Sequence, residues 1–251
     1  MPLNSTQRVQ SLTSQAETIL MGSHDPLHDH RHAGRVADYA VVIARELHVT
    51  NASHLDALKL SAWWHDISRV ITKKPSFLLM PFIDDTLSAI ILARTAIKTG
   101  KWNRTVWLAS RLILAKSVGT GKVFSRMFLT KRMRLLLDIL QDADTVDTLA
   151  SERAHDIQQL VDSSLSYHYA YRVMVWWFIS TAFLEVKTEA AKEQLLAVLK
   201  EFMIWIHEES IMAWHIERYG QAWIDHMHAR LEQLIEQLTQ EVSFAFVRVS
   251  S

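Results

Sequence analysis

Few residues in this chain can interrupt a helix. The sequence contains six glycines and four prolines among 251 residues. Its apolar residues recur mostly at the three- and four-residue spacing of amphipathic helices rather than in the alternating pattern of strands. An apolar content of 49% is enough for one large core or two modest ones. We therefore predict an all-α protein.

Apolar stripes and helix-capping residues place the predicted helices. Asp25 followed by Pro26 suits the start of the second helix, because these residue types favour the N-cap and the first turn. The last residues, SFAFVRVSS, are β-prone and suit an ordered tail. The predicted helices span residues 6–21, 26–48, 54–71, 85–98, 104–117, 130–152, 155–184, 188–209 and 211–240.

An adjacent histidine and aspartate interrupt the most apolar of these helices. In SAWWHDISR, His65 and Asp66 directly follow two tryptophans and precede Ile67. A buried carboxylate is costly unless it is paired, hydrogen-bonded or bound to a metal ion. This pair therefore needs partners from elsewhere in the chain.

Two further helices carry polar residues on their predicted core faces. In the second helix, the apolar stripe extends back by steps of four to His32 and His28, and in the sixth helix it runs into Asp144 and Asp147. The chain has no cysteine, so any metal ion must be held by histidine or carboxylate. Together these residues form a candidate site for a hard cation, although His32 or Asp147 taken alone is more typical of a hydrogen-bonded core residue, and His65 and Asp66 alone suit either interpretation.

Three segments carry a resemblance to a known family. HDHRHAGRV (28–36), AWWHDISR (62–69) and LQDADTVD (140–147) resemble the signature segments of the HD-domain metal-dependent phosphohydrolase superfamily, in its small bacterial branch. The order of the polar residues is the same, and the resemblance covers roughly residues 10–155. TEAAKEQLLAVLKEFM (188–203) is similar to the C-terminal helix of that branch.

The resemblance implies a fold, a cofactor and a reaction. The expected fold is an HD-type metal-binding helical core over residues 1–155, with C-terminal helices over 156–251 that pack on it as one compact unit. The expected metal ligands are His32, His65, Asp66 and Asp144. They would hold one divalent ion, which the sequence leaves open among Mn, Mg, Co, Ni, Fe and Zn. The implied activity is hydrolysis of a phosphate mono- or diester of a small molecule, commonly a nucleotide.

Other residues receive roles by the same resemblance. His28 and Asp147 are candidates for catalytic groups or for groups that support the ligands, and the predicted phosphate-binding residues are Arg35, Arg69, Lys73 and Lys116. Two-metal members of the superfamily carry extra histidines before the final aspartate, whereas no histidine lies between His65 and His155 here, which favours one metal. Lys116 stands where related proteins often have histidine, and it suits either a substitute positive charge or a site that has lost activity.

A basic block leaves other function classes open. Residues 86–137 contain eleven Lys or Arg and no acidic residue, although the net charge of the whole chain is zero. The block suits an anionic ligand or pairing with acidic residues of the same chain. A nucleic-acid surface is a third interpretation, which the neutral charge and the lack of a nucleic-acid motif argue against. A non-catalytic HD module with a structural or regulatory metal is the main alternative to an enzyme.

The rest of the sequence carries weaker expectations. The C-terminal helices, rich in Trp205, Trp214 and Trp223, are predicted to complete the core or to form a homodimer face. No apolar run is long enough to cross a membrane, and no secretory signal is apparent, which favours the cytoplasm. Substrate choice is assigned to the predicted loops 72–84 and 118–129.

Overall fold

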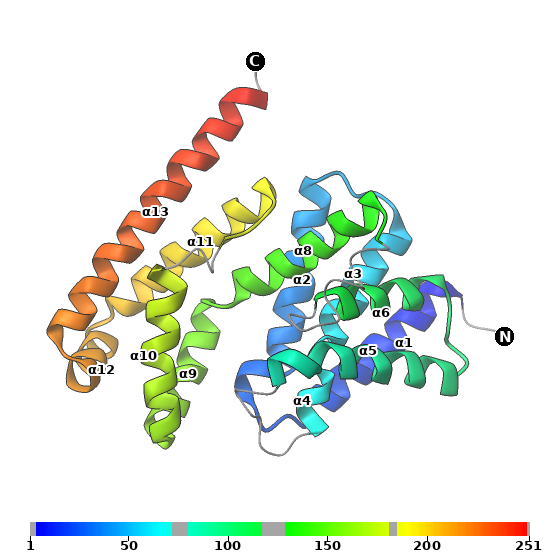
Figure 1. Cartoon of the computed structure of the whole chain (residues 1–251), viewed down its shortest axis with the longest axis horizontal. Helices are drawn as coiled ribbons and strands as arrows, with labels where there is room; N and C mark the ends of the chain where they lie inside the picture. The colour runs from blue at the N-terminus through cyan, green and yellow to red at the C-terminus, as the bar shows by residue number, and fades with distance from the viewer. Residues whose placement is uncertain (1–3, 72–79, 117–128, 181–184, 250–251) are drawn as a thin grey trace. The chain divides into compact units, whose positions relative to one another are not determined.

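The computed structural model describes residues 4–71, 80–116, 129–180 and 185–249. Within these ranges every regular element is a helix, which confirms the predicted all-α class (Figure 1). None of the helices in the described part is long and apolar enough to cross a membrane, in agreement with the sequence analysis.

The chain divides into two compact units, Met1–Asp144 and Thr145–Ser251. The division falls in the last turn of a helix, whereas the sequence analysis placed the boundary after residue 155. Packing of the C-terminal helices on the core stays a prediction.

The first unit contains α1 (Ser5–Leu20), the 3₁₀ turn η1 (Pro26–His28), α2 (His30–Glu46), α3 (Ala52–Trp64), α4 (Ile67–Ile71), α5 (Met80–Lys98), α6 (Arg104–Lys116) and most of α8 (Lys131–Asp147). The second contains α9 (Ser151–Ser163), α10 (Leu165–Ser180), α11 (Glu189–Ile206), α12 (Glu209–Tyr219) and α13 (Gln221–Val249).

Helix α3 lies at the centre of the first unit, where it packs against α1, α2, α5 and α6. Its N-cap is Asn51, whose side chain accepts a hydrogen bond from the backbone N–H of His54. Its last residue, Trp64, is fully buried and donates its indole N–H to the carbonyl of Leu12 at 3.1 Å. This anchoring of Trp64 fixes the position at which the chain continues into His65 and Asp66.

The predicted helix 54–71 breaks at His65 and Asp66, into α3 and α4. No glycine or proline marks this break. The backbone N–H of Ser68 instead donates to the hydroxyl of Ser88 on α5 at 3.1 Å, and the Ser68 hydroxyl donates to the carbonyl of Asp84 at 3.3 Å. The contacts that hold α4 therefore come from a distant helix, which local sequence patterns do not reveal.

The predicted helix 26–48 also starts later than expected. Residues Pro26–His28 form a separate 3₁₀ turn capped by Asp25, and α2 begins at His30. Asp29 is the N-cap of α2, and its carboxylate accepts from the backbone N–H groups of Arg31 and His32 at 2.9 and 3.1 Å. This cap fixes His32 in the first turn of the helix.

Three predictions for the second unit need correction. The predicted helix 211–240 is broken by Gly220, which adopts the positive φ of 86° that glycine accommodates easily. The predicted helix 155–184 is broken at Ser164, between α9 and α10. The β-prone tail continues α13 as helix to Val249.

The core of the second unit is a cluster of aromatic side chains. Tyr171 of α10 packs beside Trp214, His215 and Tyr219 of α12 and Trp223 of α13. The Tyr171 hydroxyl lies 2.9 Å from His215 Nε2 in a fully buried contact. The prediction that tryptophans of this region build a core is thus met at Trp205 and Trp214, which are 2% and 7% exposed.

Candidate metal centre

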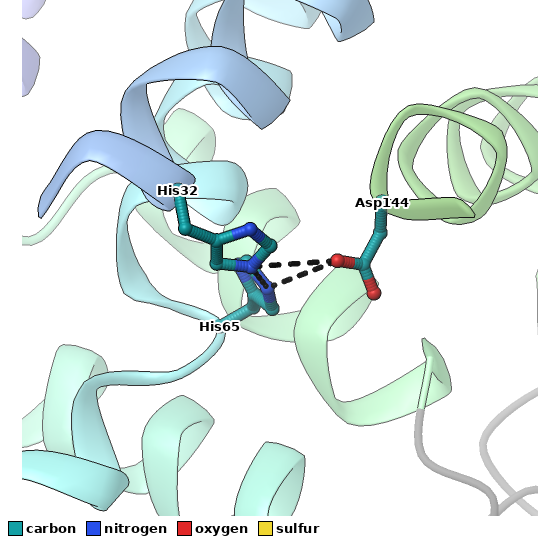
Figure 2. A group of neighbouring side chains, drawn as sticks. All are labelled: His32, His65 and Asp144. Atoms are coloured by element: carbon teal, nitrogen blue, oxygen red, sulfur yellow. Dashed lines mark hydrogen bonds and ion pairs between the residues drawn. The ribbon is translucent and has the colours of Figure 1, made fainter. Parts of the chain in front are cut away.

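Two histidines and one aspartate from three different helical segments come together in the first unit. They are His32 in α2, His65 at the end of α3 and Asp144 in α8. One donor atom from each lies within 4.8 Å of the other two. Figure 2 shows the two imidazoles side by side, with the Asp144 carboxylate directed at them from α8. The distances are 3.3 Å between the two Nε2 atoms, and 3.5 and 3.6 Å from these atoms to Asp144 Oδ1.

Asp66 adjoins the same imidazoles. Its Oδ2 lies 3.3 Å from His32 Nε2 and 3.1 Å from His65 Nε2. Asp66 does not belong to the group whose donor atoms all lie within 4.8 Å of one another. It is therefore close to both histidines but less tightly grouped with Asp144.

The tautomer of His65 is set by a backbone contact. Its Nδ1 lies 2.7 Å from the carbonyl oxygen of Ala62, so Nδ1 carries a proton and donates it there. In the neutral imidazole the lone pair is then on Nε2, the atom that faces Asp66 and Asp144. Histidines that bind metal ions are commonly oriented in this way by a hydrogen bond from the second ring nitrogen.

The spacing of the donor atoms suits a shared cation. Ligand atoms about 2.1 Å from a tetrahedral metal ion lie about 3.4 Å from one another. The contacts of His32 and His65 with each other and with Asp66 and Asp144 span 3.1 to 3.6 Å. Without a proton or a cation between them, lone pairs would face lone pairs at these distances. The residues present therefore fit a divalent ion held by imidazole and carboxylate.

The ionisation of the cluster also calls for positive charge. Burial alone would lower the pKa of His65, but the charge of Asp66 and the contact with Asp144 outweigh it and raise this pKa to about 10. Burial would raise the pKa of Asp66, but the charges of His65 and Arg69 hold it well below its ordinary value. Burial opposes the ionised form of Asp144 too, yet Lys116 and His65 keep its pKa well below the usual range. In the absence of a metal ion, a proton on His65 supplies the charge.

Two cations flank the cluster, each held between two carboxylates. Arg69 Nε contacts Asp84 and lies 3.4 Å from Asp66 Oδ1. Lys116 Nζ lies 2.9 Å from Asp144 Oδ2 and 3.7 Å from Asp85 Oδ1. The two outer carboxylates are neighbours on α5, and both are buried. One short segment of α5 thus contacts the cations on both sides of the centre.

Asp84 and Asp85 are functional candidates that the sequence analysis did not identify. They stand immediately before the basic block, in a segment assigned to a loop and the start of a helix. The sequence could have indicated them, because a Lys or Arg buried from a stretch without acidic residues needs a carboxylate partner, and these two adjacent carboxylates directly precede that stretch. Burial and the charge of Asp66 raise the pKa of Asp84 to about 7, and burial raises that of Asp85. Burial is the largest cause of both pKa shifts, and the neighbouring carboxylates add to it.

His28 lies beside the centre in a contact chain of its own. Its Nδ1 is 2.7 Å from Asp25 Oδ2 and 3.2 Å from an Arg69 nitrogen. The shorter contact indicates that Nδ1–H donates to Asp25. Burial and the charge of Arg69 lower the pKa of His28 to about 4, so its ring is neutral near pH 7. Because Nδ1–H is given to Asp25, this nitrogen has no lone pair left to accept a hydrogen bond from Arg69, and the catalytic or supporting role of His28 stays a prediction.

The roles of three other predicted site residues stay predictions. Asp147 is buried and pairs with Arg153 at 3.5 Å, so its support of Asp144 stays a prediction. Arg35 is half-buried on α2, one turn after His32, and phosphate binding by Arg35 also stays a prediction. Lys73 and most of the predicted substrate loops 72–84 and 118–129 lie outside the described residues. Met80 to Asp84, assigned to the first of these loops, belong to α5.

Access to the centre differs among its members. The side chains of His32 and His65 are each 1% exposed and that of Asp66 is 8% exposed, whereas Asp144 keeps 29% of its side-chain surface in contact with solvent. A water molecule or a small ligand would therefore meet the cluster on the side of Asp144.

Comparison of the chain with protein-family models, with curated proteins and with solved structures gave no match.

Proposed function

We propose that this chain is an HD-type metal-dependent phosphohydrolase that cleaves a phosphate mono- or diester of a small molecule, with a nucleotide as the first candidate. The observation that supports this most is the convergence of His32, His65 and Asp144 on one point, with Asp66 against both imidazoles. The donor set and the spacing suit one divalent ion of the Mn, Mg, Co, Ni, Fe and Zn group.

Each group has a role in this proposal. A divalent ion supplies a nucleophile near neutral pH, by lowering the pKa of bound water, and it neutralises charge on phosphoryl oxygens. His32, His65, Asp66 and Asp144 hold it. The hydrogen bond from His65 to Ala62 directs Nε2 into the centre. Arg69 and Lys116 stand next to two of the carboxylate ligands and supply positive charge beside the position a phosphate would take.

The decisive experiment joins metal content with turnover. Purified protein is loaded with Mn²⁺, dialysed and submitted to elemental analysis, and it is then assayed for phosphate release from a panel of nucleotides and simple phosphoesters. We expect bound metal and hydrolysis of at least one substrate. The double variant His65→Ala, Asp66→Ala is expected to lose both.

The matched control is His54→Ala. His54 lies on the same helix, α3, and only its backbone N–H takes part in the N-cap contact with Asn51. This variant should keep its metal and its activity, and circular dichroism should show that all variants remain folded. A metal-replete protein that releases phosphate from no member of the panel, with the double variant indistinguishable from it, would contradict the proposal.

A non-catalytic HD module is the second candidate, because both flanking cations already have partners. Arg69 contacts Asp66 and Asp84, and Lys116 contacts Asp85 and Asp144, so neither reaches a phosphate without giving up a contact. A metal ion here would then stabilise the fold or regulate a partner. Under this alternative Mn²⁺ raises the Tm without turnover. Loss of turnover in Asp144→Ala, with the fold intact, would exclude it.

Two residues of the basic block favour intramolecular contacts for that region. Lys116 is matched by buried carboxylates, and the guanidinium of Arg111 lies 5.5 Å from the centre of the Trp107 ring. The nucleic-acid interpretation would require strongly salt-dependent binding. The homodimer face and the cytoplasmic location stay predictions.

A further inference from the structure

The two oxygens of Asp144 face different cationic positions. Oδ1 is the oxygen within reach of the two imidazoles, at 3.5 and 3.6 Å. Oδ2 is 2.9 Å from the ammonium of Lys116. The carboxylate therefore bridges the candidate metal position and a fixed positive charge. In two-metal hydrolytic sites, carboxylates bridge two metal ions in the same manner.

Lys116 is held in this position by the protein itself. Its side chain is 14% exposed, and its second partner, Asp85, is 9% exposed and lies 3.7 Å away. Next to Asp85, the Oδ1 of Asp84 is buried without a hydrogen-bond partner in the described structure. Lys116 thus contacts carboxylate oxygens of Asp85 and Asp144, and carboxylate oxygens are the ligands that hard divalent cations prefer.

Lys116 already supplies a positive charge between Asp85 and Asp144. A divalent ion placed beside the retained ammonium in this position would meet like-charge repulsion, so the ammonium and a second ion exclude each other.

We infer that the Lys116 ammonium occupies the place of a second divalent cation, and that Asp85 and Asp144 form a latent second metal site which opens when the charge of Lys116 is removed. The inference rests on the proposed function, because it presupposes that the first ion binds at His32 and His65. It extends that function by naming the group that limits the centre to one ion.

The test counts Mn²⁺ ions in four proteins by equilibrium dialysis and elemental analysis, with electron paramagnetic resonance to detect coupled ions. We expect one magnetically isolated Mn²⁺ in the wild type and in Lys116→Arg, which keeps the positive charge. Lys116→Met should bind two ions whose spins are coupled through Asp144. Removal of the second ligand in Lys116→Met, Asp85→Asn should restore one ion.

Distinct outcomes overturn the inference and the proposed function. One ion in Lys116→Met, or two in the double variant, overturns the inference while the proposed function stands. A wild type that binds no Mn²⁺, or that binds it equally well after His65→Ala, overturns both. If Lys116→Met does not fold, Lys116→Gln replaces it, and the wild type at excess Mn²⁺ provides a further check: a spin-coupled pair there would overturn the inference.

Discussion

Two buried histidines, one in each unit, show that burial alone does not mark a functional site. His65 and His215 both donate Nδ1–H to a backbone carbonyl about one turn earlier, that of Ala62 at 2.7 Å and that of Ile211 at 2.8 Å. They differ in what faces Nε2. His215 accepts the hydroxyl proton of Tyr171, whereas His65 faces two carboxylates and another imidazole.

The pKa values record this difference. Burial lowers the pKa of His215 to about 4, because no carboxylate opposes the desolvation. Burial acts on His65 in the same direction, but Asp66 and Asp144 raise its pKa to about 10. His215 is therefore a neutral core residue with both ring nitrogens in hydrogen bonds. His65 instead needs a proton or a metal ion between its Nε2 and the carboxylates. The carboxylates around a histidine, more than its depth, distinguish a candidate ligand from a packing residue.

The largest expected effect separates the two histidines by metal affinity. His65→Ala removes a ligand and should weaken Mn²⁺ binding by more than ~100-fold, since even residues that merely support ligands contribute 10- to 100-fold. His215→Ala should leave the affinity unchanged. Equilibrium dialysis of both variants measures the effect. Similar losses of Mn²⁺ affinity in the two variants would contradict the distinction between His65 as a ligand and His215 as a core residue.

A substitution beside His215 tests the structural role of that histidine in the second unit. Tyr171→Phe removes the donor to His215 Nε2 and leaves a buried acceptor unsatisfied, at an expected cost of ~1–3 kcal/mol in the free energy of unfolding. Urea denaturation measures this cost, and the metal content should stay that of the wild type. A loss of bound Mn²⁺ in this variant would contradict the assignment of His215 to a purely structural role.

The pH dependence of the metal-free protein should follow His65. Its folded pKa of about 10 lies above the value of 6.5 expected in the unfolded chain. Its contribution to stability is therefore fully present below pH 6.5 and is lost as the pH rises through about 10, by up to about 1.4 kcal/mol per pH unit. Urea denaturation between pH 6 and 10 checks this, and His65→Ala should flatten the profile.

Metal binding should release the proton that His65 carries in the metal-free protein. An ion that binds His65 Nε2 must displace the proton there, so the affinity for Mn²⁺ should rise with pH up to about 10. Calorimetry in buffers of different ionisation enthalpy measures the protons released. Binding without any proton release at pH 7 would show that the ion does not contact His65.

The smallest effect is expected at the surface of the second unit. Asp162 pairs with Arg218 at 2.9 Å and accepts the indole N–H of Trp214 at 2.8 Å, with 44% of its side chain exposed. Asp162→Asn keeps an oxygen acceptor for Trp214 and should cost ~1 kcal/mol or less in unfolding experiments. A large loss of stability would show that exposed carboxylates matter here as much as buried ones.

The sequence predicted the inward-facing groups better than it predicted their supports. Apolar stripes directed His32 and Asp144 towards the core, because helical periodicity determines which residues share a face. The break after Trp64 and the contacts of Asp84 and Asp85 were not predicted, because they depend on α5, whose hydroxyl and carboxylate partners are 15 to 31 residues away in the chain. Such pairings are set by tertiary packing, which local patterns do not encode.

The adjacency of Asp84 and Asp85 on α5 couples the two sides of the centre. Arg69 contacts one of these residues and Lys116 the next, so a transient opening of α5 would take one carboxylate partner from each cation in a single event and leave Arg69 with Asp66 and Lys116 with Asp144. Amide hydrogens of α5 should therefore exchange with solvent together with those of α4 and the end of α6, as one cooperative segment.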